Sequence, residues 1–557
     1  MQISRRHPPL ALMALLIVGT MTSVLGDQGH GPSEKRPERA KRMGISSLAP
    51  VEVLAAGFKT ISGIAVEASG AVLVTDRAKG TLTRIDSSGN RHTLLARLHE
   101  PRGVAVDGTG DLLILDQGGS RLVRLGADGS LSVVTSSLRQ ARAVAVGPDG
   151  RVWVASRPMS SLGNRGGQSR RARASEYGIV RVEPSGALST LASGFIDVAG
   201  IAADASHVYV AMGHLATEQR RQQTTLALVP VGADGRAGAV EPLLRGRSLS
   251  AHGVAVDAVG DLFVSGAAHK RSAKADGVIL KRRRSGELST LAAALGDLVA
   301  LAFAPNGDLI AADSRHGRVL RFNATPAPLV VAPPFTNQAS VEVRGSSTHG
   351  DLVQAFWAPD LTSPVAAVTA PQSSGVFALH TPVALNTETR LSFLATAAGG
   401  AGLVSTPHTV SVVHDDRRPT VAITEPRAGA HVPDLVTLGA RGEDEDTGLA
   451  ALTFMLDDAV VERVENSEPG RSFVATAHLD TRQVLEGPRT VTVIATDRAA
   501  NTAVDAQLLV VDRTPPDTQI VTGPPEETAE GTATFTFSGT DVQSVDLDFA
   551  WRLDAGA

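Results

Sequence analysis

The sequence predicts an all-β protein in which a six-bladed β-propeller precedes a row of β-sandwiches. Units of roughly 40 residues, each with four short apolar runs, recur six times between residues 50 and 330. Further short apolar runs follow from residue 340 onward at intervals near ten residues. No helical period fits either region, and the 55 Gly and 30 Pro residues provide the turn chemistry that short strands need.

The segment 100–138 shows the repeating unit most clearly. Its runs GVAVD, DLLILD, RLVRL and LSVVT have strand character, and turns rich in Gly, Asp or Ser separate them. Because a lone four-stranded meander cannot bury both faces, the unit must pack against copies of itself. Related segments begin at residues 63, 103, 143, 200, 253 and 300, which gives spacings of 40, 40, 57, 53 and 47 residues.

Closure of the ring is predicted from the first strand-like run of the chain. VEVLAAG, from Val51, resembles the last strand of the repeats, such as LSTLASG from Leu188. We therefore expect it to form the outer strand of the sixth blade, which removes two open sheet edges. The alternative is that APLVVA, near Leu329, completes the sixth blade.

The repeats carry a pattern, G-(I/V)-A-V-D…G-x-L-x-V-x-D…G-x-(I/V)-x-(R/K)-(I/F), that resembles the NHL-repeat family of propellers. The resemblance covers about residues 50 to 330. It is best where an Asp follows the second strand, in blades one, two and six, at Asp76, Asp116 and Asp313. Blades three to five depart from it with Ser156, Gly213 and Gly266. The resemblance implies the fold and no particular activity, because this fold serves enzymes and binding scaffolds alike.

Residues 1–26 are predicted to be a secretory signal peptide. Arg5 and Arg6 precede the apolar run from Leu10 to Val18, and small residues stand before Asp27. An uncleaved anchor is the alternative, but the apolar run is short for a membrane span. We expect export to the periplasm, the cell surface or the medium, and a disordered polar leader over residues 27–48.

Three insertions between the second and third strands of blades three, four and five are rich in basic residues. Such loops lie on one face of a propeller, so we expect them to gather into a basic face that attracts anions. The alternative is that they are solvated loops whose charge serves solubility. The predicted ligand-binding residues are Arg157, Arg165, Arg170, Arg171, Arg173, Arg220, Arg221, His269, Lys270 and Arg271, together with His252 beside the channel.

A second polar group is expected where the chain enters the inner strands, at the channel mouth on that same face. It comprises Lys59, Arg102, Arg142, Asp197, His252 and Asp297. His252 and His269 suggest acid–base chemistry, and related lyases, such as the streptogramin-cleaving propellers, use polar channel residues and a metal. No regular set of ligands recurs from blade to blade here. We therefore predict no catalytic residue and no metal ligand in the propeller.

Composition limits the partners and the chemistry. The chain has no Cys, which excludes disulfides, thiol nucleophiles and Cys-ligated metals. The formal net charge is −4, so nothing attracts the whole protein to nucleic acid. The basic loops offer only Tyr177 for base stacking, which also argues against nucleic acid. We expect a monomer that binds an anionic glycan or protein partner outside the cytoplasm.

After Phe322, the Pro-rich run NATPAPLVVAPPFTN predicts a linker, and strands of a different kind follow it. They resemble bacterial immunoglobulin-like repeats, in which L-N-T-E-T-R-L-S-F-x-A-T-x-A-G-G precedes the last strand. A second copy follows Pro419, and its segment Thr492–Asn501 aligns with Leu391–Gly400 of the first. A third opens at Arg513 and is incomplete, since a sandwich needs about seven strands.

The predicted boundaries are a signal peptide at 1–26, a leader at 27–48, a propeller at 49–330, sandwiches at 331–415 and 416–512, and a partial sandwich at 513–557. Acidic residues mark the junctions, at Asp415, Asp416, Asp512, Asp517 and the loop Glu443–Asp446. Calcium takes six or more oxygens, and only two or three are visible at each junction. We therefore predict no cofactor, with calcium at these junctions as the alternative.

The leading functional hypothesis is an exported, non-catalytic recognition or scaffold protein whose propeller binds an anionic ligand or protein partner through its basic face. The first alternative is a lyase or hydrolase with a site at the channel mouth near His252. The second is a structural cell-surface or adhesion protein, rich in repeats and without a small-molecule ligand.

Overall fold

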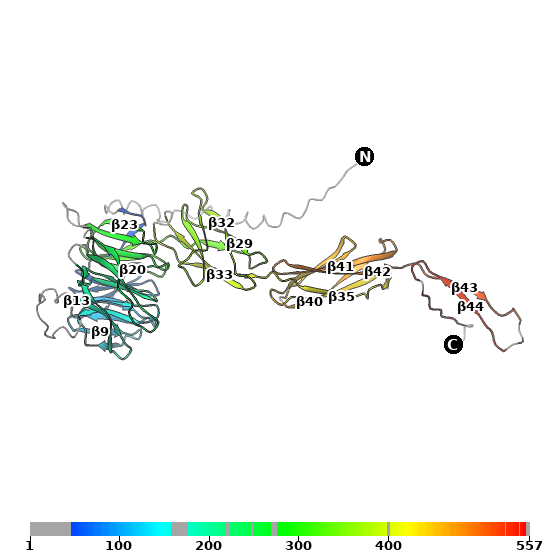
Figure 1. The fold of residues 1–557 in the computed structure, drawn as a ribbon, viewed down its shortest axis with the longest axis horizontal. Coiled ribbons are helices and arrows are strands. Elements are labelled where there is room, and N and C mark those ends of the chain that lie inside the picture. Colours follow the sequence, from blue (N-terminus) through cyan, green and yellow to red (C-terminus); the bar gives the residue numbers. More distant parts are fainter. Residues whose placement is uncertain are drawn as a thin grey trace.

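The computed structural model describes residues 46–157, 176–218, 223–246, 249–268, 276–397, 402–468, 470–527, 529, 531–544 and 546–552. Every regular element within these residues is a β-strand, which confirms the all-β prediction. Figure 1 shows a disc of sheets at one end of the molecule, two further β units in a row beside it, and a two-stranded ribbon beyond them. In the described segments we find no helix with the length and apolarity needed to cross a bilayer.

The disc contains six antiparallel sheets, each built on four strands. In sheets 1 to 5 these strands follow in chain order, and in sheet 6 the fourth strand comes from the start of the chain. Sheet 1 is β3 (Ile61–Val66), β4 (Val72–Asp76), β5 (Thr81–Ile85) and β6 (Arg91–Leu95). Sheet 2 is β7 (Pro101–Val106), β8 (Leu112–Asp116), β9 (Arg121–Leu125) and β10 (Leu131–Thr135). Sheet 3 is β11 (Arg139–Val146), β12 (Val152–Arg157), β13 (Glu176–Val182) and β14 (Leu188–Ile196), extended by β17 (His214–Leu215).

The other three sheets are also built on four strands. Sheet 4 is β15 (Gly200–Ala203), β16 (His207–Ala211), β18 (Thr224–Pro230) and β19 (Glu241–Arg245). Sheet 5 is β20 (Leu249–Val256), β21 (Leu262–Ala268), β22 (Asp276–Arg282) and β23 (Leu288–Leu295), extended by β1 (Ser46–Ser47). Sheet 6 is β24 (Leu298–Phe303), β25 (Leu309–Asp313), β26 (Arg318–Phe322) and β2 (Val51–Ala56).

The inner strands of these sheets form a closed ring. β3, β7, β11, β15, β20 and β24 each contact the next, and β24 contacts β3 again. Antiparallel sheets arranged radially around such a ring make a β-propeller. Adjacent sheets bury apolar side chains between them; Leu73 and Leu82 of sheet 1, for example, pack with Ile114 of sheet 2.

The ring is closed by a strand from far away in the chain. β2 pairs with β26, with Val51 opposite Phe322 and Glu52 opposite Arg321, as predicted. The alternative closure is wrong, because β27 (Leu329–Val331) pairs with β29 (Ser340–Ser346) outside the propeller. The predicted boundary at residue 330 therefore falls within β27.

Glycine is needed near the start of the inner strands because neighbouring strands approach each other too closely there for a side chain. A Cβ atom on Gly63 would lie 2.4 Å from the carbonyl oxygen of Arg102, and one on Gly200 would lie 2.6 Å from that of His252. Neighbouring inner strands therefore meet backbone to backbone, and only a narrow channel of about 60 Å³ remains between them.

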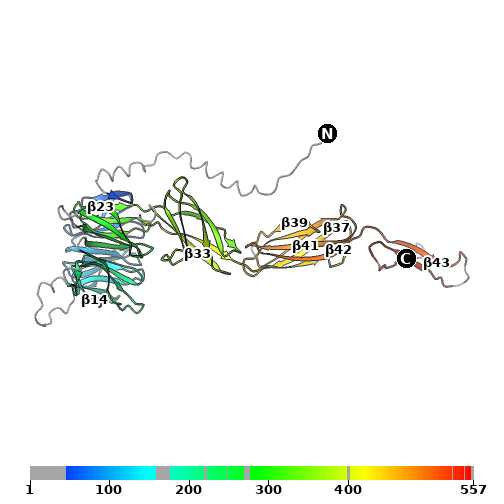
Figure 2. The same cartoon turned by 45° about the horizontal axis from the view of Figure 1, so that its top comes forward.

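Two β units of identical topology follow the propeller (Figures 1 and 2). The first has sheets β27-β29-β32 and β28-β34-β33-β30-β31, with β28 (Phe335–Thr336), β30 (Leu352–Trp357), β31 (Ala366–Thr369), β32 (Val376–Pro382), β33 (Glu388–Thr396) and β34 (His408–His414). The second has sheets β35-β37-β40 and β36-β42-β41-β38-β39. Its strands are β35 (Thr420–Glu425), β36 (His431–Val432), β37 (Leu435–Glu443), β38 (Leu449–Leu456), β39 (Ala459–Glu465), β40 (Ser472–Asp480), β41 (Gly487–Asp497) and β42 (Thr502–Val511).

Each of these units is a β-sandwich, because its two sheets enclose one apolar core. Val343 and Phe377 of one sheet pack with Phe393 of the other in the first unit, and Leu438 packs with Phe454 in the second. The segments aligned in the sequence lie on the equivalent strands β33 and β41. Beyond them, β43 (Asp517–Thr522) and β44 (Thr536–Thr540) form the ribbon.

The first sandwich docks on the propeller by a buried ionic contact. Lys281, only 1% exposed, donates from Nζ to the carbonyl oxygen of Gly402 at 2.9 Å. The same Nζ lies 3.2 Å from an Asp261 carboxylate oxygen and 5.5 Å from the centre of the Phe263 ring. Leu403 joins the apolar core of sheets 5 and 6. The contact uses the turns that follow the inner strands, so the face where the inner strands begin lies on the opposite side of the disc.

Candidate functional site

A β-bulge recurs near the start of the inner strands. The pairing register with the second strand shifts between Ile61 and Gly63, Pro101 and Val104, Arg139 and Ala143, Ala251 and Gly253, and Leu298 and Ala300. A bulge leaves one residue outside the ladder and redirects its side chain. The residues within these shifts include Ser62, Arg102, Arg142, His252 and Val299, and all five line the same cavity.

This cavity, which we call the channel mouth, has a volume of about 290 Å³. It lies on the face where the inner strands begin, above the narrow channel of the ring. Its lining residues are Thr60, Ile61, Ser62, Arg77, Arg102, Arg142, Ala199, His252, Asp297, Val299 and Ser314. The sequences of blades one, two, three, five and six thus converge on one polar chamber.

Three arginines of the channel mouth have no carboxylate partner. No carboxylate oxygen of the described residues lies within 4.0 Å of the guanidinium groups of Arg77, Arg102 or Arg142. Elsewhere in the propeller such pairs are common, and they include Arg84, Arg121, Arg124, Arg151, Arg181 and Arg321. Burial, and then the charges of Arg77 and Arg142, lower the pKa of Arg102. The cluster is therefore electrostatically strained and suited to an anion.

Neutral groups hold two of these arginines in place. Arg102 donates from Nε to Oε1 of Gln117 at 2.8 Å. Arg142 donates from Nε to the hydroxyl oxygen of the buried Tyr177 at 2.9 Å. Arg157 also stacks on that ring, with its guanidinium carbon 5.6 Å from the ring centre. These contacts orient the guanidinium groups without neutralising them.

An imidazole–carboxylate pair forms the opposite wall of the channel mouth. Nδ1 of His252 lies 3.4 Å from Oδ1 of Asp297, a contact that is not an aligned hydrogen bond. The contact with His252 lowers the pKa of Asp297, although partial burial opposes it, so this half-exposed group is a carboxylate at neutral pH. On its other side, Nε2 of His252 lies 3.5 Å from the hydroxyl oxygen of Ser250.

The structure places the predicted site residues unevenly. His252 lines the channel mouth, and Arg157 stacks on Tyr177 beside it. The predicted residues Arg165, Arg170, Arg171, Arg173, Arg220, Arg221, His269, Lys270 and Arg271 lie outside the described residues. Of the wider channel group, Arg102, Arg142 and Asp297 line the cavity with His252, whereas Lys59 and Asp197 do not.

Sequence reasoning missed Arg77, and an alignment of the repeats contains the signal that identifies it. Arg77 follows Asp76 at the end of the second strand, and the equivalent positions of sheets 2, 3 and 6 are Gln117, Arg157 and Ser314. Two of these equivalents hold or flank the arginines, and Ser314 lines the cavity. Of these four residues, Arg77 and Ser314 line the channel mouth, whereas Gln117 contacts Arg102 and Arg157 stacks on Tyr177.

The Asp that follows the second strand is structural rather than a ligand. Asp76 is fully buried, and its carboxylate accepts hydrogen bonds from the backbone N–H groups of Lys59, Thr60, Ala78 and Lys79. Asp116 similarly accepts from the backbone of His99 and from Arg121. Each of these carboxylates joins the loop before the first strand of its sheet to the turn after the second strand. It thereby fixes the backbone that carries the channel-mouth arginines.

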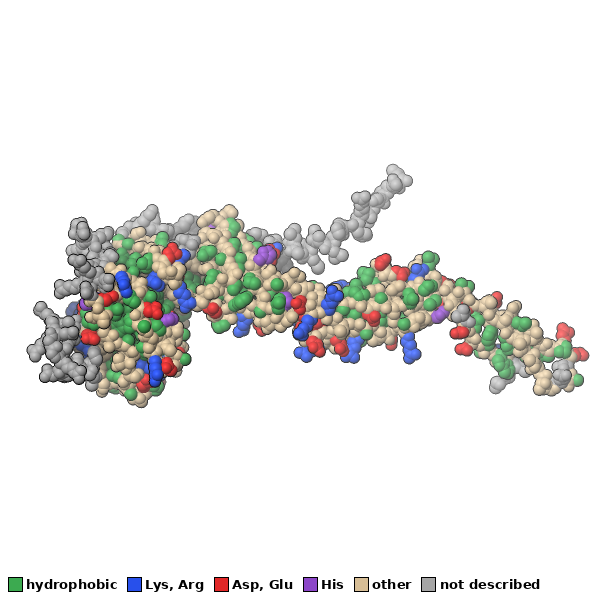
Figure 3. Space-filling view, in the orientation of Figure 1, with side chains coloured by type: hydrophobic (Ala, Val, Ile, Leu, Met, Phe, Trp, Pro, Cys, Tyr) green, Lys and Arg blue, Asp and Glu red, His purple; other side chains and the backbone are tan. Residues whose placement is uncertain are grey.

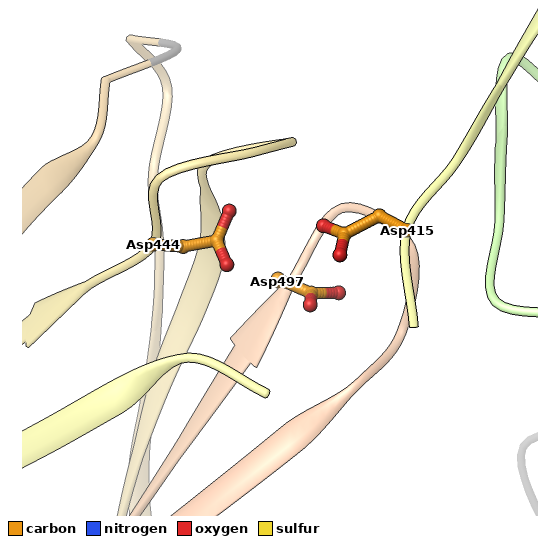
Figure 4. A group of neighbouring side chains, drawn as sticks. All are labelled: Asp415, Asp444 and Asp497. Atoms are coloured by element: carbon orange, nitrogen blue, oxygen red, sulfur yellow. The ribbon is translucent and has the colours of Figure 1, made fainter. Parts of the chain in front are cut away.

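A second polar cluster lies at the junction of the two sandwiches. The carboxylates of Asp415, Asp444 and Asp497 are at most 5% exposed, lie within 4.8 Å of one another and point toward a common centre (Figure 4). Burial, with the charges of Asp415 and Asp444, raises the pKa of Asp497. The sequence marked Asp415 and the loop containing Asp444, but it missed Asp497, and the exposed Asp416 lies outside the cluster. Figure 3 shows basic and acidic side chains gathered around this junction.

Comparison with known proteins assigns no family to this chain. No protein-family model matches the chain, and no curated relative matches it either. A gluconolactonase from Xanthomonas campestris is 16% identical, with a TM-score of 0.39, over 52% of this chain and 92% of its own. A streptogramin B lyase is 11% identical, with a TM-score of 0.35, over 49% and 97%. A PQQ-bound aldose sugar dehydrogenase from Streptomyces coelicolor is 17% identical, with a TM-score of 0.37, over 50% and 97%. With TM-scores below 0.5 these likenesses support no conclusion about this chain. The β-propeller follows instead from the radial sheets and the closed ring of inner strands.

Proposed function

We propose that this protein is an exported recognition protein that binds an anionic ligand at the channel mouth of its propeller. One observation carries the proposal: Arg77, Arg102 and Arg142 line one cavity and have no carboxylate partner among the described residues. The signal peptide, the NHL-type six-bladed assignment and the immunoglobulin-like nature of the sandwiches belong to the proposal and rest on the sequence.

An anion is expected at this site because clustered guanidinium groups repel each other, and a bound negative charge offsets that repulsion. Arg102 already has a lowered pKa, caused by burial and by its two basic neighbours, so the free site is costly and an anion relieves that cost. Guanidinium groups bind carboxylates and phosphates through paired hydrogen bonds. The described second and third strands of sheets 3, 4 and 5 end and begin on this same face. Basic loops between them would add positive charge beside the channel mouth, which favours an anionic glycan or protein partner.

The test uses the full chain and measures binding to arrays of acidic and neutral glycans at about 0.02 M and about 0.5 M salt. We expect binding to acidic glycans that weakens as salt rises. Arg102→Gln combined with Arg142→Gln should reduce affinity at least about tenfold, since hydrogen bonds to charged groups contribute about 1.5–3 kcal/mol each. The matched control is Arg344→Gln, an exposed arginine of the first sandwich that should leave binding unchanged. Equal binding by the double variant and the wild type would refute the proposal.

A specific observation favours a hydrolase as the second candidate. Ser250, His252 and Asp297 form a chain in which the hydroxyl lies 3.5 Å from Nε2 and the carboxylate lies 3.4 Å from Nδ1. This is the order of groups that activates a serine nucleophile, and such contacts are often longer in ligand-free structures. Turnover of an activated ester, lost in Ser250→Ala and His252→Ala but kept in Ser130→Ala, an exposed turn residue of sheet 2, would establish this activity. Absence of both binding and turnover would leave the structural cell-surface or adhesion role.

A further inference from the structure

One wall of the channel mouth is positively charged and the opposite wall carries a carboxylate. This difference limits which ligands fit. Sheets 1, 2 and 3 contribute the guanidinium groups of Arg77, Arg102 and Arg142, which have no carboxylate partner among the described residues. Sheets 5 and 6 contribute His252 and the carboxylate of Asp297, whose side chain is 50% exposed. A ligand that is negative along its whole length meets attraction on one wall and repulsion from Asp297 on the other.

Two hydroxyl groups in the cavity are available to a ligand. The side chains of Thr60 and Ser314 have no hydrogen-bond partner among the described residues. Ser62, by contrast, already contacts the carbonyl oxygen of Pro101 at 2.7 Å and the hydroxyl of Thr75. Together with the Asp297 carboxylate, the two free hydroxyls are suited to exchange hydrogen bonds with ligand hydroxyl groups.

The size of the cavity limits the ligand to one small ring. Its volume of about 290 Å³ is just below the range for small-molecule sites, about 300–1,000 Å³. The floor is the inner ring, where the close approach at Gly63 and Gly200 leaves a channel of only about 60 Å³. A ligand therefore enters from the open face and does not thread through the disc.

We propose that the channel mouth binds a hydroxylated monocarboxylic acid of the size of one sugar ring, with its carboxylate on Arg102 and Arg142 and a hydroxyl on Asp297. This inference rests on the proposed function and makes Asp297 the specificity-determining residue. The shared chemistry is that of a sugar acid, either free or at the end of a glycan chain. Simple polyanions are disfavoured because Asp297 faces them.

The experiment is calorimetric titration of the full chain with four small probes. D-glucuronate has both the acid and the hydroxyls, cyclohexanecarboxylate has the ring and the acid alone, glucose has the hydroxyls alone, and tricarballylate is a small trianion. We expect glucuronate to bind at least about tenfold more tightly than cyclohexanecarboxylate and tricarballylate, and glucose not to bind. A glycan that ends in glucuronate, titrated in parallel, distinguishes a chain end from a free acid by which of the two binds more tightly.

The variant Asp297→Asn separates specificity from anion binding. Asn preserves the size of the side chain and tolerates the positive φ of 54° at this position. We expect this variant to lose most of the preference for glucuronate over cyclohexanecarboxylate and to bind tricarballylate more tightly than the wild type does. A purely structural role for Asp297 would not produce this gain. Arg102→Gln should weaken both acids together.

The outcomes separate the two proposals. If neither glucuronate nor any acidic glycan binds, both the proposed function and this inference are wrong. If acids bind and Arg102→Gln weakens them, while cyclohexanecarboxylate binds as tightly as glucuronate, the proposed function stands and the inference is overturned. Tightest binding of tricarballylate to the wild type would also overturn it, as would an Asp297→Asn variant with unchanged preferences.

Discussion

At the scale of single residues, the channel mouth depends on groups that position charges rather than neutralise them. Tyr177 is the clearest case, because it is fully buried and its hydroxyl oxygen accepts from Nε of Arg142 while the ring faces Arg157. In sheet 5, by contrast, the half-buried carboxylate of Asp257 is repelled by the charge of Asp261. Asp257 has a carboxylate oxygen, Oδ2, that is buried without a hydrogen-bond partner.

Tyr177→Phe tests the positioning of Arg142. The change removes one hydroxyl and keeps the packing, so we expect a loss of stability of about 1 kcal/mol and a several-fold loss of affinity for the anionic ligand. The control is Tyr209→Phe, which removes an equivalent hydrogen bond, to Asp204, in sheet 4 and should leave affinity unchanged. Calorimetry of binding and thermal unfolding give both values. Parallel loss of affinity in both variants would show that the effect is general destabilisation.

Asp257 gives a prediction about pH. Burial, and then the Asp261 charge, raise its pKa from 3.8 to about 7. The folded state therefore holds this proton more tightly than the unfolded state does. The contribution of Asp257 to the free energy of unfolding is fully present below about pH 4 and is lost as pH rises through about 7. We expect a lower melting temperature at about pH 8 than at about pH 5, and Asp257→Asn should flatten this slope. An unchanged slope in the variant would assign the pH dependence to other groups.

At the scale of elements, the inner strand of each repeat both closes the ring and places side chains in the channel mouth. The small residues that open each strand allow the ring to close, and the bulge at the same place directs Arg102, Arg142 and His252 into the cavity. The turn after the second strand supplies the support, since Asp76 accepts four backbone hydrogen bonds there. The same few positions of the repeat therefore stabilise the fold and shape the site.

Asp76→Ala tests that support. The change leaves four backbone donors of the mouth face without their acceptor, and we expect a loss of about 3 kcal/mol or more, since each buried unsatisfied group costs about 1–3 kcal/mol. Asp128→Ala is the control, because Asp128 lies in a solvent-exposed turn and accepts from Ser130 alone. Denaturant unfolding of the two variants provides the comparison. Similar losses would contradict the assigned role.

The acidic cluster between the sandwiches leads to a prediction of increased stability. Asp444 accepts one hydrogen bond, from the backbone N–H of Gly448, and otherwise faces two carboxylates. Asp444→Asn should keep that bond, relieve repulsion and raise stability by about 1 kcal/mol in the presence of a chelator. Asp446→Asn, which removes an exposed pair with Arg417, should be neutral or slightly destabilising. Calcium at this junction stays the alternative to the prediction of no cofactor, and adding calcium to the same melting experiment checks it.

At the scale of the whole molecule, the docking of the first sandwich orients the binding face. The sandwich contacts sheets 5 and 6 at the side where their inner strands end, through Lys281 of β22 and its own Gly402 and Leu403. The channel mouth lies where those strands begin, on the other side of the disc. The two sandwiches then continue in a row away from the propeller (Figure 1). A propeller held in this way presents its open cavity away from the chain that supports it.

Lys281→Ala tests this arrangement. It leaves Asp261 without its buried cation, and breaking such a pair costs about 3–5 kcal/mol. We expect a lower melting temperature of the propeller and a less extended average shape in small-angle scattering, because the first sandwich is released. Arg236→Ala alters an exposed pair with Asp234 in sheet 4 and should change neither. An unchanged scattering profile for Lys281→Ala would show that apolar contacts alone maintain the docking.

The sequence by itself determined the features that depend on local patterns. Alternating apolar residues and Gly, Asp or Ser turns identified the strands, their recurrence predicted the propeller, and the likeness of the Val51 strand to the last strands predicted how the ring closes. Arg102, Arg142, His252 and Asp297 were placed near the channel because residues that lead into equivalent strands occupy equivalent positions.

Only the tertiary structure decided which of these side chains meet. Lys59 and Asp197 are adjacent in sequence to the same strands but lie outside the cavity, while Arg77 and Ser314 enter it from another turn. Asp497 joins Asp415 and Asp444 although more than 50 residues separate it from each in the chain. The physical reason is that spacing along one strand describes a face of that strand, whereas a site forms where bulges, turns and ring closure bring several strands together.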